Sequence, residues 1–115
     1  EIYKRIKHKR ITPEIVNEIY KEYETPEHVR RHCAAVADCG VRIAKALNAH
    51  GFHLDLALIN GAGLAHDAAR TMERHWDIMA ERLNEMGYYD EASRVNIIRW
   101  IRLRSRISYV WETVL

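Results

Sequence analysis

Apolar residues recur along this chain at the spacing of three and four residues that places them on one face of an α-helix. The same start, Thr-Pro-Glu, occurs at residues 12–14 and 25–27. A threonine can cap the first free amides of a helix, and proline is tolerated in the first turn. We therefore expect a helix from Pro13 that the second start ends, and a long helix from Pro26 to about Asn48.

The long helix carries an apolar stripe that we expect to face the core. The stripe consists of Val29, Cys33, Val36, Gly40, Ile43, Ala44 and Leu47. Further helical patterns cover residues 55–66, 73–86, 90–103 (with Asp90 as the cap) and 107–114. No β-type alternation occurs, and 5 Gly and 2 Pro leave little material for the turns of a β fold. The patterns predict an all-α protein, a compact bundle of about six helices.

The size and composition of the chain indicate one soluble globular domain. With 115 residues, we expect a single domain over 1–115, in which 1–24 form a basic arm and first helix and 25–115 form the core. A hydrophobic content of 48% with 30% charged residues argues against disorder. The net charge of +2 does not by itself require a nucleic-acid partner.

Positive charge gathers near both ends of the chain. The first ten residues include Lys4, Arg5, Lys7, Lys9 and Arg10, and the late arginines are Arg94, Arg99, Arg102, Arg104 and Arg106. We interpret the first run as a solvated flexible arm, with contact to phosphate backbones as the alternative. The late arginines either steer an anionic nucleotide or solvate exposed faces. Nucleic acid ranks last among the partners that we consider.

The cysteines and the hydropathy pattern bear on the location of the protein. Cys33 and Cys39 lie six residues apart in one helical pattern, about 9 Å along the axis, which is unsuited to a disulfide between them. Free thiols fit the reducing cytoplasm, where we expect this protein. No apolar run approaches the ~20 residues that cross a bilayer, and no signal-peptide pattern is present, so no membrane is expected.

The candidate chemistry centres on the doublet His66-Asp67, at the end of a helical pattern. His32 and His75 lie near the apolar faces of two other predicted helices. Taken alone, an inward histidine is more often a hydrogen-bonded core residue than a ligand. Adjacent residues are ~100° apart on a helix, so both members of the doublet can reach one ion only where the helix ends. Imidazole and carboxylate ligands together suit a divalent metal, which generates a hydroxide nucleophile near neutral pH.

Two segments resemble the HD-domain metal-dependent phosphohydrolases. They are residues 25–33 (Thr-Pro-Glu-His-Val-Arg-Arg-His-Cys) and 64–70 (Leu-Ala-His-Asp-Ala-Ala-Arg). The similarity spans roughly residues 25–115. That superfamily is all-α and takes its metal ligands from an upstream histidine, the His-Asp doublet and a late aspartate. The resemblance implies that His32, His66 and Asp67 are ligands.

The resemblance extends to three further positions. His75 matches a histidine that opens the next helix in related members, and Arg70 matches a basic residue suited to gripping a substrate phosphate. Glu112 stands where the late aspartate is expected, and its alternative interpretation is a surface residue. In many relatives the helix that corresponds to residues 90–103 ends in a histidine. Residues 96–101 supply none, so we expect a site for a single metal ion.

The resemblance implies a phosphoester hydrolase in which Asp67 and Arg70 serve catalysis. The expected metal set is His32, His66, Asp67, His75 and Glu112. The expected cofactor is one divalent ion (Mn, Fe, Zn, Ni or Mg), and the expected substrate is a small phosphorylated molecule, a nucleotide. The alternative is a degenerate HD domain that has lost catalysis and acts as a binding or interaction module. A homo-oligomer is left open.

Overall fold

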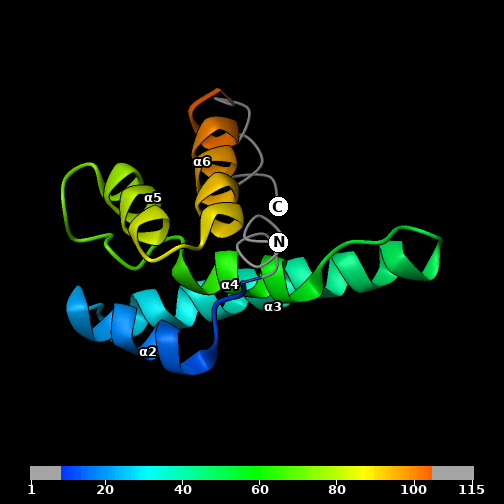
Figure 1. The fold of residues 1–115 in the computed structure, drawn as a ribbon, viewed down its shortest axis with the longest axis horizontal. Coiled ribbons are helices and arrows are strands. Elements are labelled where there is room, and N and C mark those ends of the chain that lie inside the picture. Colours follow the sequence, from blue (N-terminus) through cyan, green and yellow to red (C-terminus); the bar gives the residue numbers. More distant parts are fainter. Residues whose placement is uncertain (1–8, 105–115) are drawn as a thin grey trace.

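A computed structural model describes the backbone of residues 9–104 and the side chains of residues 9–96. Its helices, in chain order, are α2 (Pro13–Glu22), α3 (Glu27–Ala49), α4 (Leu56–Ala65), α5 (His75–Glu85) and α6 (Tyr89–Arg104) (Figure 1). Residues 9–104 contain no strand, which confirms the all-α fold class. They hold five helices rather than the expected six, and the pattern at 107–114 falls outside them. No helix in this range combines the length and the hydrophobicity that a bilayer span requires.

Helices α3 and α4 lie against each other along the whole of α4 (Figure 1). A Cβ atom placed on Gly63 of α4 would lie 2.7 Å from Cα of Ala37 in α3. One placed on Gly40 of α3 would lie 3.0 Å from Cγ2 of Ile59. The two backbones therefore approach closely at Gly63, where any side chain would force them apart.

The expected apolar stripe of α3 is only partly covered. α3 has 23 residues and α4 has 10, and the close approaches of Gly63 to Ala37 and of Gly40 to Ile59 place α4 against the middle of α3. Ile43 is 58% exposed and Leu47 is 37% exposed, although the sequence pattern places both on the inward stripe. The prediction was wrong for these two residues, whereas Ala44 of the same stripe is 1% exposed, so only part of the stripe is buried.

The two Thr-Pro-Glu starts have different structures. Thr12 caps α2 as expected, since its side chain accepts a hydrogen bond from the amide of Ile15. Thr25 does not cap α3: it is 2% exposed, and its hydroxyl donates to the carbonyl of Ala68 at 2.7 Å. The second start therefore fastens the N-terminus of α3 to the segment that follows the His-Asp doublet.

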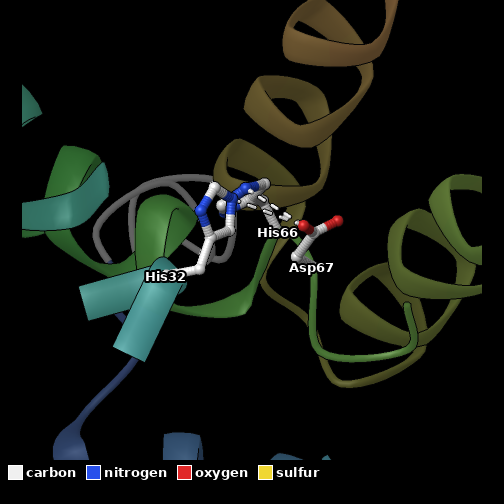
Figure 2. A group of neighbouring side chains, drawn as sticks. All are labelled: His32, His66 and Asp67. Atoms are coloured by element: carbon white, nitrogen blue, oxygen red, sulfur yellow. Dashed lines mark ion pairs between the residues drawn. The ribbon is translucent and has the colours of Figure 1, made fainter. Parts of the chain in front are cut away.

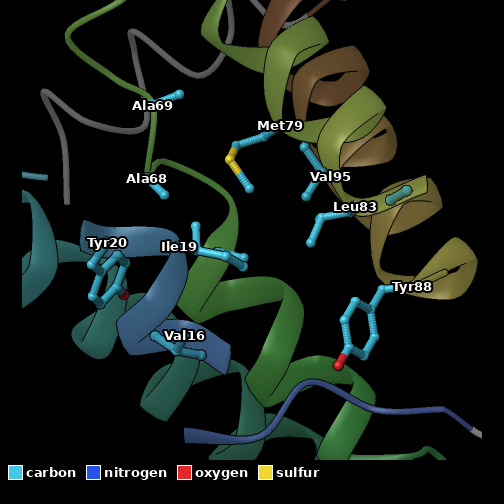
Figure 3. Packing of buried hydrophobic residues seen from close by; sticks show 11 residues of the cluster. Val16, Ile19, Tyr20, Ala68, Ala69, Met79, Leu83, Tyr88 and Val95 are labelled. Carbon is cyan, nitrogen blue, oxygen red and sulfur yellow. The ribbon is translucent and has the colours of Figure 1, made fainter. Parts of the chain in front are cut away.

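The main core joins α2, α5 and α6 to the connection between α4 and α5 (Figure 3). Its largest fully buried apolar side chains include Ile19, Met79, Leu83 and Val95. Burying one such side chain stabilises the fold by ~1.5–3 kcal/mol. Ala68 and Ala69 belong to the same core, so this packing also holds the chain directly after the doublet.

The segment before α2 is bound to the domain. The side chain of Arg10 pairs with Asp55, at the start of α4 (2.7 Å), and with Asp90 of α6 (3.0 Å). The amide of Ile11 donates to Oε2 of Glu91 at 3.0 Å. The expected flexible arm is therefore wrong for residues 9 and 10. Asp90 lies inside α6 and pairs with Arg10, so the expected capping role is also wrong.

We first predict the effect of a methyl group at the α3–α4 contact. Gly63→Ala and Gly40→Ala both gain ~1 kcal/mol of helix propensity. Gly63→Ala also displaces the backbone of Ala37, whereas Gly40→Ala meets only the end of the Ile59 side chain. Gly63→Ala should therefore have a free energy of unfolding ~1–3 kcal/mol below that of Gly40→Ala in urea titrations. Equal values for the two variants would contradict the close approach of the helices.

The second prediction concerns pH. Glu91 is fully buried, and this burial raises the pKa of its carboxyl above the ordinary value, against the opposing effects of the Ile11 amide and Arg10. A raised folded-state pKa stabilises the fold below the unfolded-state pKa, and this contribution is lost as pH rises through the folded-state pKa. The free energy of unfolding of the wild type minus that of Glu91→Gln should therefore fall between about pH 4 and about pH 7.

This comparison uses urea titrations at both pH values. Glu81→Gln, at an exposed position of α5, controls for the removal of one carboxylate. If the free energy of unfolding of the wild type minus that of Glu91→Gln rises with pH, the raised pKa of Glu91 is contradicted.

Candidate metal centre

Three donor groups converge where α4 ends. His32 of α3, His66 and Asp67 each offer a ligand atom, and these atoms lie within 4.8 Å of one another (Figure 2). Nε2 of His32 is 3.5 Å from Oδ2 of Asp67, and Nε2 of His66 is 3.9 Å from the same oxygen. Two ligands of one ion, each ~2.1 Å from it, lie at most about 4.2 Å apart. Both distances to Oδ2 of Asp67 fall within this limit, and the group could hold one metal ion.

The end of α4 explains how both members of the doublet reach one point. α4 ends at Ala65, and His66 is its C-cap. The Nδ1 atom of His66 lies 2.6 Å from the carbonyl oxygen of Gly63. A carbonyl only accepts, so Nδ1 must carry the proton, and the lone pair of the ring is then on Nε2, which faces Asp67. This backbone contact orients a ligating histidine and selects its tautomer.

Asp67 is the buried centre of the group, with 1% of its side chain exposed. Its Oδ1 is buried and has no hydrogen-bond donor within the described part of the chain. An unsatisfied buried carboxylate oxygen is costly, and a cation beside it removes that cost. The donor set of two imidazoles and one carboxylate fits a divalent metal, whereas Oδ1 lies on the side of His75.

His32 leaves one side of the centre open. Its side chain is 42% exposed, in contrast to those of His66 and Asp67. A ligand can therefore approach the centre from the side of His32.

The next residue, Cys33, is fully buried. Burial raises the pKa of the Cys33 thiol, which therefore remains neutral and is a poor metal ligand. The cysteines of the described chain are free, as the sequence predicted.

His75 lies on the other side of Asp67. It opens α5, and its Nε2 is 3.6 Å from Oδ1 of Asp67, the oxygen that faces away from the three-donor contacts. Its ring lies 4.9 Å from that of Trp76, which in turn lies 6.1 Å from the ring of His66. Trp76 packs against the core and lies beside the rings of both histidines.

Arg70 and Glu112 complete the set of predicted site residues. Nη1 of Arg70 lies 3.2 Å from Oδ2 of Asp67, so the structure places this arginine beside the candidate ligands. Glu112 lies outside the described residues. Sequence reasoning missed the carbonyl of Gly63 and the hydroxyl of Thr25, because backbone acceptors and long-range hydrogen bonds leave no spacing signal.

Comparisons with known proteins add little beyond this geometry. No family model matches the chain, and no solved structure matches it. The chain is similar to an uncharacterized protein of Methanocaldococcus jannaschii, with 31% identity over 72 residues. This match covers 60% of the chain and 43% of the relative, so the chain spans less than half of that protein.

The third prediction tests the centre directly. After equilibrium dialysis against Mn²⁺ or Zn²⁺, the wild type should retain about one ion per chain by elemental analysis. His66→Ala and Asp67→Asn should lose it, the second with almost no change of shape. His50→Ala, in the exposed turn after α3, is the matched control and should retain the ion. Wild-type stoichiometry in folded Asp67→Asn, judged by circular dichroism, would contradict the site.

Proposed function

We propose that this protein is a metal-dependent phosphohydrolase of the HD superfamily. The observation that carries the proposal is the buried Asp67 carboxylate with His32, His66 and Arg70 around one of its oxygens. Imidazole and carboxylate donors on an all-helical scaffold agree with the resemblance of segments 25–33 and 64–70 to that superfamily. The cation and the arginine are the two groups that phosphate chemistry needs.

Each residue has a role that follows from its position. His32, His66 and Asp67 hold the metal. The Nδ1–H of His66 bonds to Gly63 and keeps Nε2 directed at the site. A divalent metal bound there would lower the pKa of a coordinated water and neutralise charge on phosphorus oxygens. Arg70, with 46% of its side chain exposed, donates to the phosphate. Asp67, being buried, keeps its carboxylate in place while substrate enters beside His32.

We propose a small phosphoester, a nucleotide, as the substrate. The support is the combination of a cation site, one arginine and an approach on the exposed side of His32, which suits one phosphate group with its ester. The two free cysteines accord with a reducing compartment, and we propose that the protein acts in the cytoplasm.

The fourth prediction is hydrolysis that depends on the centre. With added Mn²⁺, the wild type should release phosphate from generic phosphoesters or from members of a nucleotide panel. Asp67→Asn should reduce the rate by ~100-fold or more, because loss of a direct ligand exceeds the 10–100-fold effect of groups that only support ligands. His50→Ala should match the wild type. The measurement is phosphate release at saturating metal.

One outcome would overturn the hydrolase. A wild type that binds about one metal ion and hydrolyses nothing in the panel would favour the other candidate, an HD-like module that binds without catalysis. The sequence features behind that alternative are the replacement of the late aspartate by Glu112 and the absence of a histidine near Ile101.

A further inference from the structure

One oxygen atom, Oδ2 of Asp67, faces Arg70 and both of the candidate histidine ligands. Nη1 of Arg70 is 3.2 Å away, Nε2 of His32 is 3.5 Å away and Nε2 of His66 is 3.9 Å away. Of the two carboxylate oxygens, Oδ2 is therefore the one that faces both candidate nitrogen ligands. A metal held by these three residues has to use the same oxygen that Arg70 now occupies.

Two cations on one oxygen repel each other strongly in a partly buried site. This repulsion favours movement of one partner when a metal binds. Asp67 is 1% exposed and follows the end of α4, and the core holds the next two residues, Ala68 and Ala69. The side chain of Arg70 is 46% exposed and long, so it can leave the carboxylate for water at small cost.

When no metal is bound, the ion pair between Arg70 and Asp67 is favourable. Without a cation, the Asp67 carboxylate would be a buried negative charge with an unsatisfied Oδ1, and Arg70 offsets part of that cost. Within residues 9–96, this ion pair is the polar contact that holds the Arg70 side chain. The guanidinium thus supplies positive charge to the oxygen that a metal would use.

We propose that Arg70 exchanges between Asp67 and the substrate phosphate, so that metal and phosphate binding reinforce each other. This inference rests on the proposed metal site. When a divalent cation occupies Oδ2, Arg70 is displaced and becomes available for a phosphate oxygen. When phosphate holds Arg70, Asp67 loses its competitor and binds the cation more tightly. By linkage, the two effects are equal in size.

The alternative to exchange is that Arg70 stays on Asp67 and only orients this ligand. If the guanidinium stayed on Asp67 and oriented the carboxylate toward the metal, removing it would weaken metal binding, by 10–100-fold for a typical supporting group. Exchange predicts the reverse sign. The sign of the change in metal affinity therefore separates a competitor from a supporting residue.

The experiment is isothermal titration of Mn²⁺ into the wild type, Arg70→Gln and Arg74→Gln, with and without inorganic phosphate. Arg74 is the matched control, an exposed arginine on the same connection, paired with Asp77. Without phosphate, Arg70→Gln should bind Mn²⁺ about 5–10-fold more tightly than the wild type. Saturating phosphate should tighten the wild type about 5-fold or more, after correction for manganese phosphate in solution, and should leave Arg70→Gln unchanged. Arg74→Gln should behave as the wild type.

The outcomes distinguish failure of the exchange from failure of the metal site itself. Weaker or equal Mn²⁺ binding in Arg70→Gln, or a phosphate effect that survives in it, overturns the exchange and leaves the metal centre standing. Absence of Mn²⁺ binding in both the wild type and Arg70→Gln overturns the proposed function and the exchange together. Circular dichroism of each variant shows that the fold is intact before the titration.

Discussion

The structure depends on keeping one carboxylate, that of Asp67, away from water at the junction of three segments. A buried charge without partners destabilises a fold by several kcal/mol, and it is tolerated only where cationic or hydrogen-bonding groups surround it. Here the surrounding groups come from α3 (His32), from the doublet itself (His66), and from the chain that follows (Arg70 and His75). One oxygen of this carboxylate, Oδ1, has no hydrogen-bond partner among the described residues.

The helix crossing that brings these groups together is set by backbone contact. Gly63 allows α4 to approach Ala37 of α3, and the same residue supplies the carbonyl that fixes the tautomer of His66. Packing and chemistry are thus coupled through one glycine. A change that separates α3 from α4 would also move His32 away from the doublet, since His32 lies one and a half turns before Ala37 on the same helix.

The rest of the fold fastens the connection after the doublet. Thr25 binds the carbonyl of Ala68, and the core encloses Ala68 and Ala69. On the other side, Arg10 ties the start of α4 to α6 through two carboxylates. Both ends of α4 are therefore anchored by contacts between segments that are distant in sequence, and these contacts help to position the candidate donors.

Local patterns along the chain were enough to predict the described helices and to single out His32, His66 and Asp67 as candidate donors. The spacing of apolar residues located the described helices because an α-helix repeats every 3.6 residues regardless of its neighbours. The ending of a helical pattern at His66 indicated that both members of the doublet could reach one ion. The convergence of His32 on that doublet was predicted, and the three donor groups do lie together.

Tertiary structure alone decided how far each helix is covered and which atoms meet. Ile43 and Leu47 lie on an apolar stripe, yet they are exposed, whereas Ala44 of the same stripe is buried. Thr25 and Arg10 look like a helix cap and a solvated arm in sequence, but their partners lie 43 and 45 residues away, at Ala68 and Asp55. That Arg70 and the two histidines share a single oxygen of Asp67 likewise follows from three-dimensional packing. Spacing along a chain defines the face on which a residue lies, whereas contacts between distant segments define what that face touches.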